Sequence, residues 1–171
     1  MRAVFDRMLG NSSSARQQNS KPAPRKQTQH TVPPIRQDSG NPQELYLATA
    51  SGLITVQLLP KYPSPKKAFG AIMTNKRASG YLFGFHDSLL QHQGLRDQNN
   101  QSQAVELMEM SYRQLFGQQA GYVLFSSALN SQDDTEFAEG RINGGNELVA
   151  FLEKEVPPFG LGRILILGMK S

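Results

Sequence analysis

The sequence contains no cysteine and no tryptophan among its 171 residues. Without cysteine, the chain has no disulfide scaffold, no thiolate zinc site, no iron–sulfur cluster and no cysteine nucleophile. Its longest near-apolar runs, Tyr122–Phe125 and Ile164–Leu167, are far shorter than the roughly 18–20 residues of a membrane-spanning helix. Residues 1–10 also lack the continuous apolar stretch of a secretory signal. These absences favour a cytoplasmic protein without a transmembrane segment.

Catalytic motifs are missing as well. The sequence has no phosphate-binding loop, no G-x-S-x-G, no H-E-x-x-H and no EF-hand spacing. Its three histidines are His30, His86 and His92, and the last two lie on different sides of a helix if they share one. We therefore expect a protein that is not an enzyme and holds no metal or cofactor. If a site of unfamiliar type exists, its natural location is around Tyr81, His86 and Tyr112.

Acidic pairs at helical spacing suggest a metal site only superficially. Glu106 and Glu109 are three residues apart, and so are Glu136 and Glu139. Di-iron bundles use inward-facing glutamates together with Glu-x-x-His pairs. Here the second member is glutamate in both cases, and all four lie off the apolar stripes. They are typical of a solvated helix face.

The basic charge is confined to the start of the chain. Residues 1–42 contain seven basic and two acidic side chains, so this segment has a net charge of +5. The remaining residues have a net charge of −1, which gives +4 for the whole chain. Between Gly10 and Asn41 the only aliphatic side chains larger than alanine are Val32 and Ile35. Such a segment cannot bury enough apolar surface to offset the entropy lost on ordering. The sequence predicts that 1–42 is a disordered tail rich in proline, glutamine and serine.

The first nine residues differ from the rest of that tail. Val4, Phe5, Met8 and Leu9 would share one face of a helix. This pattern suggests a short docking helix that folds in a groove of a partner. The alternatives are an ordinary frayed terminus and an organelle transit peptide, since the tail that begins with these residues is rich in arginine and serine.

Two runs near residue 50 have the pattern of strands. Ile54, Val56 and Leu58 alternate with polar residues, and Ser51-Gly52 separates this run, Leu53–Leu59, from Glu44–Ala50. Period-two alternation around a short glycine link predicts a β-hairpin. The continuous apolar run Ile164–Leu167 predicts a last strand covered on both faces.

The residues between these strands have helical periodicity. The first helix is expected from Ser64, with Pro65 in its first position, to near Gly94. The second is expected from about 102 to 129, with a break near Gly117 or Gly121. The third follows a cap at Ser131 or Asp133 and ends near Lys154, as one helix or two. Gly80 and Gly84 would lie on one face, which indicates close approach of another backbone.

Together these elements predict an α+β domain over 43–171. A small antiparallel sheet, made of the N-terminal hairpin and the C-terminal strand, would pack against about three helices.

Two hypotheses for the function follow. The first is an interaction module that binds another protein or a larger assembly, as an adaptor, chaperone-like accessory or subunit, with the tail as a flexible tether and homo-oligomers allowed. The second is a nucleic-acid-associated factor that makes weak, non-specific contacts through the tail. The basic residues of the tail that would contact nucleic acid are Arg16, Lys21, Arg25, Lys26 and Arg36.

Overall fold

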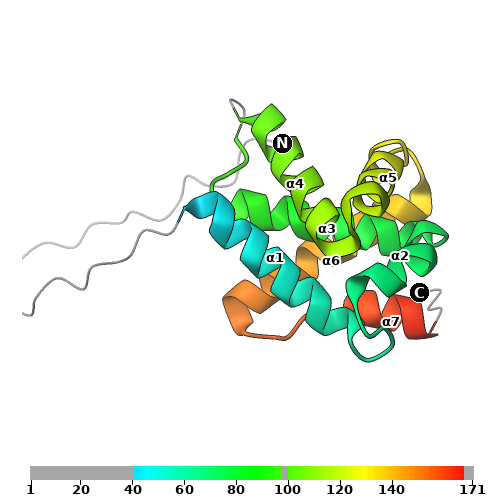
Figure 1. Cartoon of the computed structure of the whole chain (residues 1–171). Helices are drawn as coiled ribbons and strands as arrows, with labels where there is room; N and C mark the ends of the chain where they lie inside the picture. Colours follow the sequence, from blue (N-terminus) through cyan, green and yellow to red (C-terminus); the bar gives the residue numbers. More distant parts are fainter. Residues whose placement is uncertain (1–40, 98–99, 168–171) are drawn as a thin grey trace, which may run out of the picture. The chain divides into compact units, whose positions relative to one another are not determined.

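The computed structural model describes residues 41–97 and 100–167, and its architecture is helical throughout (Figure 1). The seven helices among these residues belong to one unit, Asp38–Ser171. No strand occurs in the described ranges, so the predicted α+β class, with its hairpin, its last strand and its sheet, is wrong. The helices are α1 (Pro42–Leu58), α2 (Pro65–Met73), α3 (Lys76–His92), α4 (Gln101–Phe116), α5 (Gln118–Leu129), α6 (Thr135–Lys154) and α7 (Gly160–Leu167).

Helix α1 replaces the predicted hairpin. Asn41 caps it, since its side-chain oxygen accepts a hydrogen bond from the Gln43 amide at 3.1 Å, and Pro42 occupies the first turn, where its missing N–H costs nothing. The buried side of α1 recurs every four residues, at Tyr46, Ala50, Ile54 and Leu58. Ser51 and Gly52 are therefore the middle of a helix and not a turn.

The predicted first helix is two helices. Pro65 begins α2 as expected, although the Ser64 side chain makes no capping hydrogen bond. The chain then breaks at Thr74, and the Asn75 side chain accepts a hydrogen bond from the Ala78 amide at 2.9 Å, which caps α3. The predicted end near Gly94 is confirmed, because α3 stops at His92 and Gly94 has a φ of 68°.

The later helices agree more closely with the sequence pattern. The break expected near Gly117 is confirmed, and this glycine, with a φ of 95°, separates α4 from α5. Helix α6 is one helix, capped by Asp134 through the Phe137 amide at 3.0 Å and not by Ser131 or Asp133.

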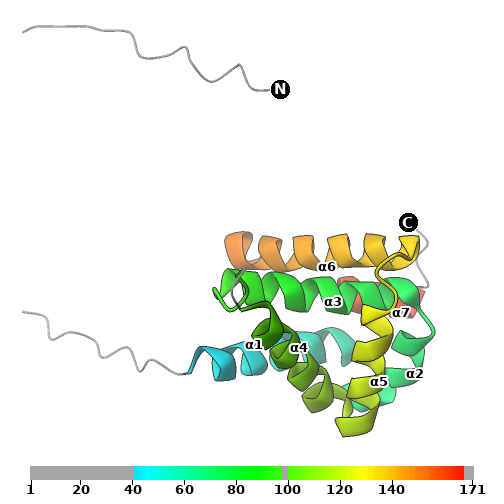
Figure 2. The same cartoon turned by 90° about the horizontal axis from the view of Figure 1, so that it is seen from above.

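Helices α3 and α6 lie side by side and parallel (Figure 2), and glycines bring their backbones into contact. A Cβ atom added to Gly80 or Gly84 would lie 2.0 or 1.9 Å from a carbonyl oxygen of α6, and one added to Gly140 or Gly144 would lie 2.1 Å from a carbonyl oxygen of α3. The predicted close approach at Gly80 and Gly84 is therefore confirmed. Only glycine leaves room for such contact, in which Cα–H groups meet carbonyl oxygens.

Helix α7 occupies the run predicted to be a strand. It packs against α1, α3 and α6, and Gly162 lets it approach the Gln57 carbonyl, which an added Cβ atom would meet at 2.7 Å. A short apolar run is compatible with either a buried strand or a buried helix, so its periodicity does not decide between them. The inner faces of α1 to α5 and α7 and Leu148 of α6 form the hydrophobic core.

Candidate functional site

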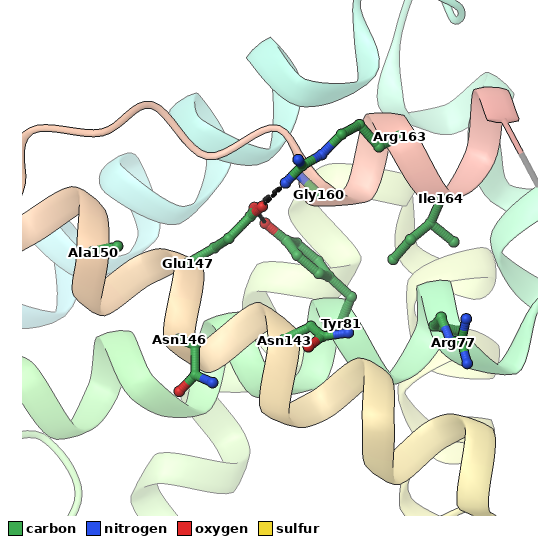
Figure 3. Close-up of a pocket in the computed structure, with 9 residues that line it drawn as sticks. All are labelled: Arg77, Tyr81, Asn143, Asn146, Glu147, Ala150, Gly160, Arg163 and Ile164. Atoms are coloured by element: carbon green, nitrogen blue, oxygen red, sulfur yellow. Dashed lines mark hydrogen bonds and ion pairs between the residues drawn. The ribbon is translucent and has the colours of Figure 1, made fainter. Parts of the chain in front are cut away.

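A pocket of about 410 Å³, lined mainly by residues with polar or charged groups, lies between α3, α6 and α7 (Figure 3). Figure 3 shows Glu147 of α6 and Tyr81 of α3 pointing toward one another, with Arg163 of α7 reaching the same carboxylate. The residues that line the pocket are Arg77, Tyr81, Asn143, Asn146, Glu147, Ala150, Gly160, Arg163 and Ile164.

The polar groups of this pocket bind one another. The Tyr81 hydroxyl lies 2.5 Å from Oε2 of Glu147 and 3.0 Å from Oε1 of Gln57. The same two oxygens accept hydrogen bonds from the first amides of α7, Gly160 at 2.7 Å and Leu161 at 3.1 Å. Arg163 forms an ion pair with the other oxygen of Glu147. Since the first amides of a helix have no partner within it, these side chains cap α7.

Tyr81 keeps its proton in this setting. Burial, and then the Glu147 carboxylate beside the hydroxyl, raise the pKa of Tyr81. A tyrosine that stays protonated can donate a hydrogen bond but does not supply a phenolate for catalysis. We interpret Tyr81, Gln57 and Glu147 as the α7 clamp, which joins α1, α3, α6 and α7.

Substitution of Glu147 by alanine should release α7. The Gly160 amide loses its acceptor, and a buried donor without a partner costs about 1–3 kcal/mol, whereas the Tyr81 hydroxyl keeps the Gln57 oxygen as its acceptor. The ion pair with Arg163 adds little, because the Arg163 side chain is 58% exposed. We expect hydrogen exchange at the amides of residues 160–167 to accelerate at least tenfold, while α3 and α6 keep their protection.

The matched control is Asn146→Ala, since Asn146 lines the same pocket and is exposed. It should leave exchange in α7 unchanged. Equal protection of α7 in the Glu147 variant and the native chain would contradict the clamp.

His86 lies in the core, not at a surface site. Its side chain has no exposed surface, and its Nδ1 atom is 2.9 Å from the Tyr46 hydroxyl. Its ring centroid lies 5.1 Å from that of Tyr112, which is also buried. The hypothetical enzymatic site around Tyr81, His86 and Tyr112 is thus divided, because Tyr81 belongs to the α7 clamp. A histidine without access to solvent cannot take a proton from a substrate in this conformation.

Burial also sets the ionisation of this cluster. It lowers the pKa of His86 to about 3, and it raises the pKa of both Tyr46 and Tyr112. At neutral pH the imidazole and both hydroxyls are uncharged, so Tyr46 and His86 form a neutral hydrogen bond. This arrangement stabilises the junction of α1, α3 and α4.

The acidic pairs behave as surface residues. Glu109 forms an ion pair with Arg113 one turn along α4, at 2.6 Å, and Glu139 forms one with Arg77 of α3. Within residues 41–97 and 100–167, no cluster of three or more His, Asp or Glu side chains has the arrangement of a metal site.

The second concave surface is apolar. It has a volume of about 410 Å³ and lies between α1, the end of α6 and the segment that leads to α7. In Figure 1 that segment, in orange, passes beside α1, in cyan. We call this surface the α1 groove, and its lining residues are Ala48, Thr49, Gly52, Leu53, Val56, Phe151, Pro157, Pro158 and Phe159.

The outer face of α1 forms one wall of this groove. Leu45, Val56 and the C-cap residue Leu59 are each more than half exposed, and the smaller Ala48 and Gly52 lie between them. Glu44 is the one charged residue in the helix. A helix that is apolar on all sides is normally buried on all sides. The outer face of α1 therefore has the composition of an interface.

Several sequence-derived candidates lie outside the described residues. They are the proposed docking residues Val4, Phe5, Met8 and Leu9, and the basic residues Arg16, Lys21, Arg25, Lys26 and Arg36. Both hypotheses about them stay predictions. Among the described helices, none is long and apolar enough to cross a bilayer.

Sequence reasoning missed the α1 groove because it assigned Leu53–Leu59 to a sheet. The Asn41-Pro42 pair, a strong helix start, was the signal that could have located α1.

Comparison with known proteins adds no further constraint: no protein-family model, curated protein or solved structure matches this chain.

Proposed function

We propose that this protein is a non-enzymatic interaction module that binds another protein chain through the α1 groove. The observation that carries the proposal is the outer face of α1, which is exposed, apolar and almost without charge. Monomeric proteins rarely expose a contiguous apolar patch of several hundred Å² unless it serves an interaction. The wall formed by Pro157 and Phe159 gives that face a concave shape into which side chains can insert.

The composition of the groove favours a helical or extended apolar segment as its ligand. No charged side chain is among the described residues that line it, so it offers nothing to recognise a phosphate, a sugar or an ionic metabolite. Apolar grooves of this kind typically take the apolar face of an amphipathic helix. A role as an adaptor or as a subunit of a larger assembly fits this chemistry.

Photo-crosslinking tests the proposal. A benzophenone amino acid at Val56, introduced into the full chain in its native host, should form adducts with a protein that mass spectrometry identifies. The same group at Glu106, which is exposed on α4, is the control and should give at most background.

The yield at Val56 should fall at least tenfold when Gly52 is changed to arginine, because a long charged side chain would fill the groove. Equal yields at Val56 and Glu106 would contradict the proposed function.

A further inference from the structure

The outer face of α1 has a symmetric arrangement about Gly52. Leu45 and Leu59 lie seven residues before and after this glycine, and Ala48 and Val56 lie four residues before and after it. At 3.6 residues per turn these five positions fall on one stripe of the helix. Large side chains stand at the two ends of the stripe, and a shallow region lies at its centre.

Gly52 is a helical glycine whose surface contacts no other element among the described residues. Each glycine that joins α3 to α6 would place a Cβ atom against a backbone carbonyl, whereas a Cβ atom at Gly52 would meet no heavy atom within 4 Å. Small residues at the centre of a helix face let a second helix approach closely. Gly52 and Ala48 supply that opening where apolar side chains surround it.

We infer that the occupant of this surface is a second copy of the chain, an inference that rests on the proposed function. The α1 helices of the two copies would pack antiparallel, with Gly52 near the two-fold axis. A two-fold axis pairs the same patch on both copies, so the patch must be complementary to itself. Antiparallel packing about Gly52 places Leu45 of one copy beside Leu59 of the other, and Ala48 beside Val56. Large residues then meet at the ends, and the small residue of each copy receives a valine.

Charge favours the same orientation. Glu44 lies at the start of α1, and Lys61 lies just beyond its end, where its Nζ atom also donates a hydrogen bond to the Leu165 carbonyl at 2.8 Å. An antiparallel copy brings the acidic end beside the basic end twice and opposes the two helix dipoles. A parallel copy would bring Glu44 beside Glu44, which is unfavourable.

The size of the surface predicts a weak dimer. A helix of 17 residues presents a strip about 25 Å long. With the flank at Phe159, two such strips bury on the order of 1,000 Å² in total, the lower limit for a specific interface. We expect a dimer that forms at micromolar concentration and dissociates on dilution.

Sedimentation of the full chain tests the inference. Between about 1 and 200 µM the average mass should rise from 18.9 kDa toward twice that value. Val56→Glu should weaken association at least tenfold, because the dimer would bury two uncompensated charges. Ile142→Glu is the matched control, since Ile142 is exposed on α6 away from the α1 groove, and it should associate like the native chain.

Cross-linking tests the orientation, and the absence of native cysteine makes the background clean. A mixture of Leu45→Cys and Leu59→Cys chains should be joined by a short bismaleimide, whereas either variant alone should give little product. Efficient cross-linking of Leu45→Cys to itself would overturn the antiparallel arrangement.

A native chain that stays monomeric at about 200 µM would overturn the inference altogether. If Val56 still formed adducts with a different protein in the photo-crosslinking experiment, the proposed function would stand with another occupant. If the chain stayed monomeric and Val56 formed no adducts with a different protein, both the dimer and the proposed function would be contradicted.

Discussion

Replacing Gly84 with alanine should abolish stable folding or cost about 4 kcal/mol or more, a large share of the roughly 5–15 kcal/mol that stabilises an ordinary domain. The added methyl group would lie 1.9 Å from the Arg141 carbonyl oxygen, and 2.6 Å from its carbon. Both atoms belong to the backbone of α6, so no side-chain rotation can relieve the overlap. Helices α3 and α6 would have to separate along their shared interface.

Urea unfolding of the full chain measures the effect, and Gly70→Ala provides its matched control. Gly70 also lies inside a helix, but a Cβ atom there would meet nothing within 4 Å. Alanine at Gly70 should therefore be neutral or stabilise the protein by about 0.5–1 kcal/mol, through the lower entropy of the unfolded chain. A Gly84 variant as stable as the native chain would show that α3 and α6 do not touch at this point.

Acidification should destabilise the protein through His86. In the folded chain burial holds the pKa of His86 near 3, whereas an unfolded histidine has a pKa of about 6.5. The unfolded state therefore binds more protons below pH 6.5, and stability falls as the pH falls from 6.5 toward 3. Between pH 7.5 and pH 5 this single residue should remove about 2 kcal/mol, and above pH 7.5 it should have no effect.

The pH dependence of urea unfolding measures this loss, with two variants to assign it. His86→Gln cannot titrate and should remove most of the slope between pH 7.5 and 5, whereas His92→Gln, at an exposed position, should keep it. A second measurement needs no substitution: the NMR signals of the His86 ring should not titrate between pH 7.5 and 4.5. Titration of His86 near pH 6.5 in the folded protein would contradict its burial.

The helices in the middle of the chain could be predicted from the sequence, because local residues mark where most of them begin or end. Pro65 marks a first turn, Gly94 and Gly117 mark ends where the chain takes positive φ, and apolar residues recur at steps of three and four. The break at Asn75 was missed, since the apolar stripe continues across it and only the side-chain cap reveals a new helix. The pairing of Gly80 and Gly84 on one face also predicted close helix packing correctly.

The two ends of the domain were misassigned because the local pattern is ambiguous in each. Helix α1 is apolar over most of its surface, so it lacks the one-sided periodicity that identifies a surface helix. Helix α7 does have an exposed side, at Arg163 and Ile166, but its eight residues are too few for periodicity to distinguish a helix from a strand. In α1 the alternation of Ile54, Val56 and Leu58 imitates a strand, although Gln57 is buried and Val56 is exposed. Tertiary contacts determine that these two segments are helices, because their local sequence pattern is compatible with either a strand or a helix.

The candidate site could not be predicted because it depends on segments far apart in the sequence. The α1 groove joins residues 48–56 with Phe151 and Pro157–Phe159, and no spacing rule relates them. The α7 clamp likewise joins Gln57, Tyr81 and Glu147. The sequence did indicate a protein without a familiar catalytic motif.

The parallel packing of α3 against α6 has a consequence for the order of folding. Two antiparallel helices can form around a short turn, as α4 and α5 do at Gly117. Parallel neighbours must instead be joined by a long connection, here the whole segment 93–134, and the entropy of closing that loop is lost before the glycine contacts form. We therefore expect α4 and α5 to associate early and the docking of α6 on α3 to limit the folding rate. The most tightly packed interface of this protein would then be among the last parts to form.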